Sequence, residues 1–387
     1  MKQKVLYSSL DTPAVLIDLD KLEVNIREMS QLAADAGVRL RVHVKSHECA
    51  SIAKMQIESG ACGIELGPVS QAEALAEEGI NDIIIAHPGY YGAHKLETLK
   101  RLLKKPQTKV TVVVDMIEQA MGVSQAGRAV GCKVPILIKI DLGSSSRYGI
   151  PPGKPTLDFA NKLRSLPNIE LKGIYSHEMV EERTVEAIDK LAFDAASIMA
   201  ETAKILRKEG IKIEHVSVGS SATFRSTCRY IKEKKFPEIT EIHPGQCVIG
   251  DIMYMKFFGN TRETCALTVL TTVMSTSHSD WAIIDAGYKT FGADYLIAYY
   301  KDPGFFWRGI PSFGSIQGRQ DLWPGNLCAE TSYIYYMTPN EKLKIGDRLE
   351  IVPNNATLVI NIHDQIYGVR NGIVERVFPV TGRGKGN

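Results

Sequence analysis

The sequence predicts an α/β protein, a (β/α)8 (TIM) barrel followed by a β-rich domain. Up to about residue 255, short apolar runs alternate with longer amphipathic stretches, as strands alternate with helices. Several runs are β-branched and apolar throughout, as from Val110 to Val114, which is typical of strands buried on both faces of a parallel sheet. Eight strand–helix units over about 240 residues match a barrel. A doubly wound sheet is the alternative, but no early GxGxxG turn supports it.

The elements of the barrel follow from the periodicity of apolar residues. Strands are expected at residues 39–45, 62–66, 82–86, 110–115, 134–141, 169–176, 213–219 and 239–248. Helices are expected at residues 21–36, 70–78, 93–104, 116–130, 155–165 and 185–209, and another begins directly after Lys45.

The pattern changes after the eighth unit. Strand-like runs follow at residues 265–274, 281–285, 332–337, 347–352, 357–362 and 366–369. Asn371 and Gly372 are typical of a hairpin turn. Residues 299–325 are rich in glycine, proline and aromatic residues and are expected to form a long ordered loop. We therefore expect a barrel domain at residues 12–255 and a β-strand domain at residues 256–387 that includes residues 1–11.

The composition excludes several classes of protein. Hydrophobic residues make up 44% of the 387 residues, charged residues make up 23%, and the net charge is +2, so we expect no nucleic-acid or membrane partner. No apolar run approaches the roughly 18–20 residues of a membrane span, and the first residues lack the features of a signal peptide. The seven cysteines are scattered and show no CxxC spacing, which indicates reduced thiols in a cytoplasmic protein.

The first predicted strand carries the most informative residue, Lys45. Side chains alternate along a strand, so Arg41, His43 and Lys45 share one face. Three basic side chains on one face repel one another unless the site binds an anion or keeps one amine neutral. A lysine whose pKa is lowered by cationic neighbours is suited to forming a Schiff base with a carbonyl. The alternative is an exposed edge strand that is polar on one face.

Lys45 ends its strand, and catalytic residues of such barrels lie at the carboxyl ends of the strands. Polar residues occupy equivalent positions in other units: Glu65, His87, Asp115, Asp141, Arg147, Tyr175 and His177. Each alone is compatible with a cap or a salt-bridged loop residue. Their convergence on one rim favours an active site.

A small-residue turn follows the seventh strand, at residues 219–223. A turn of this kind at the start of a helix presents backbone N–H groups to an anion, and barrel phosphate sites often follow strands seven and eight. The hydroxyls of Ser220, Ser221 and Thr223 add donors, and the turn at Gly245 and Gln246 lies near the same rim. The alternative is a simple N-capping turn. A Schiff-base lysine and a phosphate turn on one rim together predict pyridoxal phosphate.

Several motifs recur in a fixed order. They are residues 11–15 (DTPAV), 41–47 (RVHVKSH), 140–143 (IDLG) with 147–149 (RYG), 173–178 (GIYSHE), 216–223 (VSVGSSAT) and 285–289 (DAGYK). As a set, over nearly the whole chain, they resemble the D-threonine aldolase and D-serine dehydratase group. These are fold-type III pyridoxal phosphate enzymes, which share the barrel of alanine racemase.

The resemblance implies roles for individual residues. Lys45 is then the Schiff-base lysine, and His177 and His47 are the candidate acid–base residues. The implied cofactor-binding residues are Lys45, His43, Arg147, Tyr175, Gly219, Ser220, Ser221, Thr223, Gly245 and Gln246. The resemblance also implies a homodimer, in which the β domain of one subunit closes the barrel mouth of the other.

The chain departs from the family at the metal site. The family carries a His-x-Cys or His-x-Asp pair after a Pro-Asn turn, but here Asn355 and Thr357 occupy those two positions. Neither is a good ligand for zinc or manganese. His363 and Asp364 are adjacent, and on a strand they point to opposite faces, so we expect them to be structural. The sequence therefore predicts no metal site.

The predicted function is a pyridoxal phosphate-dependent lyase, an aldolase or a dehydratase, acting at Cα of a small D- or 3-hydroxy amino acid with altered metal dependence. Without a metal, chemistry at the β-hydroxyl needs a protein acid or base, such as His177 or His47. An amino-acid racemase or epimerase is the alternative, because it needs only deprotonation at Cα. A non-catalytic cofactor carrier and a binding protein with a purely structural Lys45 are two further hypotheses.

Overall fold

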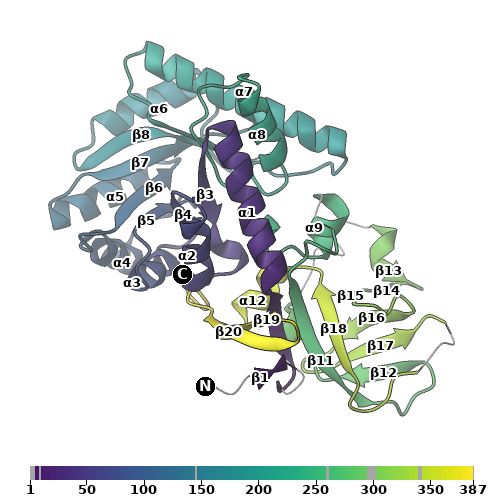
Figure 1. The fold of residues 1–387 in the computed structure, drawn as a ribbon. Helices are drawn as coiled ribbons and strands as arrows, with labels where there is room; N and C mark the ends of the chain where they lie inside the picture. Colours follow the sequence, from purple (N-terminus) through teal and green to yellow (C-terminus); the bar gives the residue numbers. More distant parts are fainter. Residues whose placement is uncertain are drawn as a thin grey trace. The chain divides into compact units, whose positions relative to one another are not determined.

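The computed structural model describes residues 5–7, 10–143, 146–258, 261–293, 302–338 and 342–386. Its internal contacts divide the chain into two compact units (Figure 1). The barrel unit comprises Ile26–Lys45, Cys49–Cys247 and Lys385–Asn387. The strand unit comprises Met1–Asn25, Ser46–Glu48 and Val248–Gly384.

The barrel unit contains a closed sheet of parallel strands in the order β10-β3-β4-β5-β6-β7-β8-β9 (Figure 1). They are β3 (Arg39–His43), β4 (Gly63–Leu66), β5 (Asp82–Ile85), β6 (Lys109–Val114), β7 (Val134–Lys139), β8 (Ile169–Tyr175), β9 (His215–Val218) and β10 (Glu241–Ile242). Seven lie within the predicted runs, and β6 begins one residue before its run, so the predicted barrel is confirmed. Its carboxyl ends share one rim, because all the neighbouring pairs are parallel.

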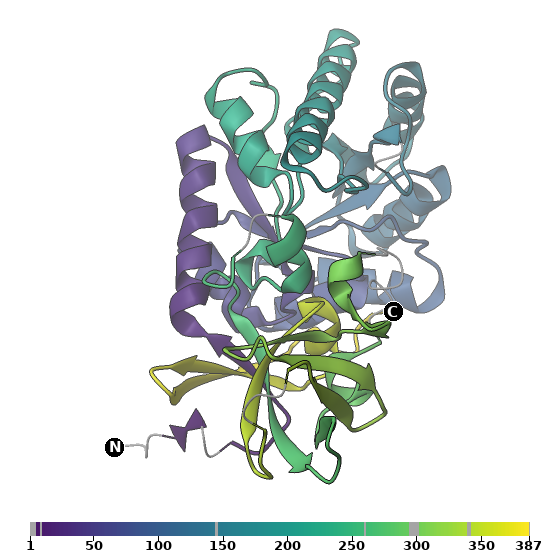
Figure 2. The same cartoon turned by 90° about the vertical axis from the view of Figure 1, so that its right-hand side faces the viewer.

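Helices follow or precede these strands. They are α1 (Leu19–Ala36), α2 (Ala50–Glu58), α3 (Val69–Glu77), α4 (Ala93–Leu103), α5 (Ile117–Val130), α6 (Lys154–Arg164), α7 (Val185–Lys208) and α8 (Phe224–Lys232). Figure 2 shows helices standing outside the barrel strands. The prediction directly after Lys45 is wrong: the strand ends at His43, a 3-10 turn covers Val44–Ser46, and α2 begins only at Ala50. In the described residues, no helix combines the length and apolar character needed to cross a membrane.

The strand unit is built on a ten-stranded sheet. Its main path is β1-β20-β19-β2-β11-β12-β17-β16, and β18 pairs with both β11 and β15. The strands are β1 (Val5–Leu6), β2 (Ala14–Asp18), β11 (Leu267–Ser275), β12 (Trp281–Ile284), β15 (Gly314–Ile316), β16 (Leu322–Leu327), β17 (Ser332–Tyr336), β18 (Arg348–Pro353), β19 (Gln365–Arg370) and β20 (Ile373–Pro379). The short helices are α9 (Ile252–Phe257), α10 (Tyr288–Phe291) and α12 (Ala356–Asn361). The predicted hairpin turn lies between β19 and β20, where Asn371 and Gly372 have φ values of 49° and 72°.

Two predictions in this unit are wrong. Residues 357–362 were expected to form a strand but lie in and just after helix α12, whose buried residues Ala356, Val359 and Ile360 have the spacing of one helix face. The expected long loop carries β13 (Phe306–Trp307), β14 (Ile310–Pro311), β15 and β16. Its residues 299–301 lie outside the described residues. Short pairings such as that of β13 with β14 contain too few residues to show the alternation of apolar and polar side chains that predicts a strand.

Candidate active site

Lys45 lies in the 3-10 turn that follows β3, at the carboxyl end of the barrel. Its side chain is half-buried, and its backbone N–H donates to Nδ1 of His43 at 3.3 Å. Burial lowers the pKa of Lys45; Glu65 opposes this shift and Arg147 reinforces it. The expected direction of the shift is therefore found, but burial contributes more to it than the cationic neighbours do.

Arg41 does not belong to a cationic face with Lys45. Its Nε lies 3.1 Å from Oε1 of Glu241, and its Nη1 lies 2.7 Å from Oδ1 of Asp82. Arg41 and Glu241 are both buried, so each charge needs the other. Arg41 thus forms a structural ion pair inside the barrel. Its charge is neutralised there, so it does not add to the repulsion that was expected between Arg41, His43 and Lys45.

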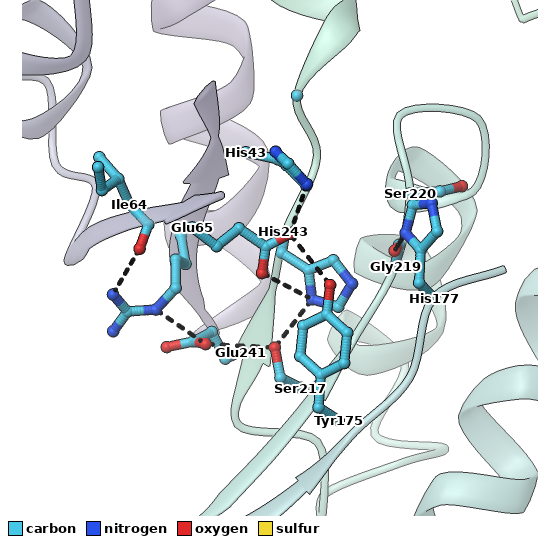
Figure 3. A network of polar contacts seen from close by, with 12 residues as sticks. His43, Ile64, Glu65, Tyr175, His177, Ser217, Gly219, Ser220, Glu241 and His243 are labelled. Carbon is cyan, nitrogen blue, oxygen red and sulfur yellow. Dashed lines mark hydrogen bonds and ion pairs between the residues drawn. The ribbon is translucent and has the colours of Figure 1, made fainter. Parts of the chain in front are cut away.

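A polar network fills the barrel interior beside Lys45 (Figure 3). The hydroxyl of Tyr175 donates to Oε1 of Glu65 at 3.1 Å, and the Tyr175 ring stacks on His243 with centroids 4.5 Å apart. Nδ1 of His243 lies 2.8 Å from the hydroxyl of Ser217, which donates to Glu241 at 3.2 Å. Burial, followed by the charge of Glu241, raises the pKa of Glu65 to about 8. Glu65 therefore binds its proton at neutral pH.

The histidines around this network are neutral. Burial and then the charge of Lys45 hold the pKa values of His43 and His177 well below the ordinary value. Burial and the same lysine lower the pKa of His87 to about 4. Nδ1 of His177 lies 3.3 Å from the carbonyl oxygen of Gly219, which fixes the proton on Nδ1 and leaves Nε2 as a proton acceptor. His177 therefore has the state expected of a general base.

The turn at residues 219–223 lies on the same rim, between β9 and α8. Gly219 has a φ of 127°, which favours glycine. A Cβ on Gly245 would lie 2.5 Å from the carbonyl oxygen of His43, so the eighth turn also requires glycine. The hydroxyl of Ser221 accepts a 2.9 Å bond from the N–H of Gly245 and joins the two turns. Among the described residues, no hydrogen bond occupies the N–H groups of Ser221 and Ala222.

The alternative of a simple capping turn describes only part of this geometry: the hydroxyl of Ser220 accepts the N–H of Thr223 at 3.3 Å, but neither Ser221 nor Thr223 caps α8. Thr223 occupies the N-cap position of α8, but its side chain makes no capping bond. Its hydroxyl donates instead to Oε2 of Glu178 at 3.1 Å and accepts from the N–H of Ser220 at 3.0 Å. The turn is therefore held by side chains, while two N–H groups at the start of α8 stay available to an anion.

Sequence reasoning missed Lys139 and Glu178. Lys139 ends β7, is 5% exposed, and places its Nζ 4.6 Å from the centre of the Tyr175 ring. Burial lowers the pKa of Lys139 to about 8. The strand was predicted at residues 134–141, two residues past the observed end of β7 at Lys139, so Lys139 was placed inside the strand and not at the rim.

The other predicted residues differ in their surroundings. Arg147 is exposed, but its charge acts on Lys45 and His87, and Gln246 is half-buried in a short 3-10 turn. His47 is fully buried and belongs to the strand unit by its contacts. Asp115 accepts a 2.9 Å bond from Gln119 at the start of α5.

The positions that would carry a metal pair are structural. Asn355 is the N-cap of α12, and its Oδ1 accepts from the N–H groups of Thr357 at 3.0 Å and Leu358 at 3.3 Å. His363 follows α12 in a turn, not on a strand as expected, and its Nε2 lies 3.0 Å from the carbonyl oxygen of Thr290. Over the described part of the chain, no cluster of three His, Cys, Asp or Glu side chains is arranged to hold a metal.

The fold and the rim define a class: a (β/α)8 barrel with a lysine of lowered pKa on the rim that also carries the glycine- and serine-rich turn at residues 219–223. Residues 17–252 match the family model of the alanine racemase N-terminal domain, and residues 266–369 match a putative serine dehydratase domain. A 3-hydroxy-D-aspartate aldolase of Paracoccus denitrificans is 31% identical, over 98% of this chain and 94% of that protein. A D-threonine aldolase of Arthrobacter is 30% identical, over 97% and 93%.

Solved structures give the same result. The crystal structure of D-threonine aldolase from Filomicrobium marinum superposes with a TM-score of 0.86 at 27% identity and covers 100% of both chains. An alanine racemase of Methanococcus maripaludis aligns over only 42% of this chain. The chain therefore belongs to the alanine racemase-like family. Within it, the chain belongs to the group of pyridoxal phosphate-dependent lyases that includes D-threonine aldolase and D-serine dehydratase.

Proposed function

We propose that this protein cleaves a bond of a small D-3-hydroxy amino acid with pyridoxal phosphate attached at Lys45. The observation that carries the proposal is the half-buried Lys45 with its lowered pKa, on the barrel rim that also bears the turn at residues 219–223. A lowered pKa keeps more of the amine in its neutral, nucleophilic form.

The residues present fit the cofactor. The open N–H groups of Ser221 and Ala222 supply donors for a phosphate at the start of α8, and Gly245 keeps the neighbouring turn free of a Cβ. Tyr175 and His243 provide a flat stacked surface in the interior. When bound, pyridoxal phosphate supplies an electron sink for bond cleavage at Cα.

His177 is our candidate for moving the proton of the substrate's β-hydroxyl. Its Nε2 is free to accept a proton, and its neutral state persists through the physiological range because burial and Lys45 depress its pKa. Lys139, with a pKa of about 8, is a second group in this barrel that can exchange a proton near neutral pH. In metal-bearing lyases a metal ion acts on such a hydroxyl, and we assign that role here to His177. The homodimer, the role of His47 and the cytoplasmic location stay predictions.

The test is product analysis with the holoenzyme. We would incubate it with D-threonine, D-serine and 3-hydroxy-D-aspartate, and with their L forms, with and without a chelator. An aldehyde identifies an aldolase, and a keto acid identifies a dehydratase. We expect one of the two from a D substrate, at an unchanged rate with chelator. Deuterium uptake at Cα with inversion and no cleavage would identify the racemase alternative and contradict the proposal.

A further inference from the structure

Glu178 connects the end of β8 to the turn after β9. Its side chain is 2% exposed. Oε1 accepts the N–H of Gly219 at 3.0 Å, and Oε2 accepts the hydroxyl of Thr223 at 3.1 Å. The two carboxylate oxygens therefore hold the first and last residues of the turn.

The neighbouring residue completes this attachment. Nδ1 of His177 lies 3.3 Å from the carbonyl oxygen of Gly219, so both backbone groups of Gly219 are bound by consecutive side chains of one segment. Within the turn, Thr223 also accepts the N–H of Ser220. The bonds occupy the ends of the turn and leave the N–H groups of Ser221 and Ala222 open among the described residues.

A buried carboxyl group is costly unless its oxygens are hydrogen-bonded. Burial raises the pKa of Glu178, while the bonds from Thr223 and Gly219 and the charge of Lys139 oppose that shift. The N–H of Gly219 and the hydroxyl of Thr223 both donate to the carboxyl group of Glu178. The two bonds from Gly219 and Thr223 offset the cost of burying this carboxyl group.

We propose that Glu178 is a positioning residue for the cofactor's phosphate, which holds the turn at residues 219–223 in its binding conformation before the cofactor arrives. This inference rests on the proposed function, because it assumes that the phosphate binds at that turn. A preformed turn avoids the ordering cost that binding would otherwise carry. Glu178 acts through Gly219 and Thr223 and not by contact with the phosphate.

The test compares pyridoxal phosphate with pyridoxal, which lacks the phosphate. Dissociation constants of both would be measured by fluorescence for apo wild type, Glu178→Ala, Glu178→Gln and the exposed control Glu170→Ala on β8. We expect Glu178→Ala to weaken pyridoxal phosphate about 10- to 100-fold and to leave pyridoxal within about twofold. Glu178→Gln keeps an oxygen for Gly219 and should recover most of the affinity. Glu170→Ala should match wild type.

The outcomes separate the two proposals. If wild type binds no pyridoxal phosphate, the proposed function fails. If wild type binds it and Glu178→Ala binds it as tightly, the inference is overturned, because Glu178 then does not position the turn. Tighter binding by Glu178→Ala overturns it too, because the carboxylate then competes with the phosphate. An equal loss for pyridoxal overturns it as well, because the effect is then not specific to the phosphate. If Glu178→Ala does not fold, Glu178→Asp shortens the reach of the carboxylate to Gly219 and Thr223 and should give a smaller, still phosphate-specific loss.

Discussion

The hydroxyl of Tyr175 lies 3.1 Å from Oε1 of Glu65, across the interior of the barrel from β8 to β4. Both side chains are almost completely buried. The pair sits beside Lys45, whose pKa Glu65 partly restores. The state of this carboxyl group therefore affects both the stability of the barrel and the reactivity of its rim.

Glu65 should make the barrel less stable as the pH rises. Its folded pKa is about 8, above the ordinary value of 4.5, so the folded state binds the proton that the unfolded state has lost. Its contribution to the free energy of unfolding is complete below about pH 4.5 and falls by up to about 1.4 kcal/mol per pH unit until about pH 8. In Glu65→Gln this part of the pH dependence of the free energy of unfolding should vanish. Urea unfolding between pH 5 and pH 8 would measure it, with the exposed Glu78→Gln as control; parallel curves for wild type and Glu65→Gln would refute the assignment.

Lys139 should depress the basicity of the histidines around it. Its charge lowers the pKa values of His87, His177 and His243. Lys139→Met should therefore raise the pKa of His87 from about 4, as measured by NMR titration of the ring protons. Lys172→Met is the matched control. Lys172 lies on β8, the same strand as Tyr175, but its amine is paired with Glu170 at 2.7 Å, so its removal should leave the pKa of His87 unchanged. An unchanged pKa of His87 in Lys139→Met would contradict this prediction, because the Lys139 amine would then lie too far from His87 to affect it.

Much of this site could be predicted from the sequence, because it depends on local patterns. Apolar runs identify the strands, and the position of a residue at a strand end identifies the rim that carries Lys45 and His177. The bond between Glu178 and Gly219 could not be predicted, because it joins residues 41 positions apart that meet only when β8 pairs with β9. Lys139 was missed because the predicted strand extends two residues beyond the end of β7.

The strand predicted at residues 357–362 failed for a different reason, because residues 356–361 form helix α12. Its residues 356–360 are mostly apolar and partly β-branched, as in a strand, but they form a helix that the side chain of Asn355 caps. An asparagine directly before such a run is also an N-cap signal. A side chain can lose one family function and keep a structural one that the sequence signals just as clearly.

Asn355 should therefore contribute to stability as a helix cap. Asn355→Ala removes the acceptor for the N–H groups of Thr357 and Leu358 and should lower the free energy of unfolding by about 1 kcal/mol. Asn355→Asp keeps an acceptor oxygen and should stay close to wild type. Denaturant unfolding of the two variants would measure this difference. Equal loss in both would mean that the cap is not what Asn355 contributes.

His177 should matter for turnover more than for cofactor binding. His177→Gln keeps a polar group near Gly219 but cannot act as a base, so we expect kcat to fall by about 10²- to 10⁴-fold. The dissociation constant of pyridoxal phosphate should change little, because the proposed phosphate donors are the N–H groups of Ser221 and Ala222. Steady-state kinetics with the preferred D-amino acid, together with cofactor titration, would separate the two effects. A variant with normal kcat would transfer the proton role to Lys139 or His47.

The central claim is that pyridoxal phosphate joins the chain at Lys45. The most direct measurement is reduction of the holoenzyme with borohydride, followed by digestion and mass spectrometry of the labelled peptide, in wild type, Lys45→Ala and Lys139→Met. We predict a single label on Lys45 in wild type and in Lys139→Met, and none in Lys45→Ala. A label on Lys139, or no label in wild type after incubation with the cofactor, would contradict the account.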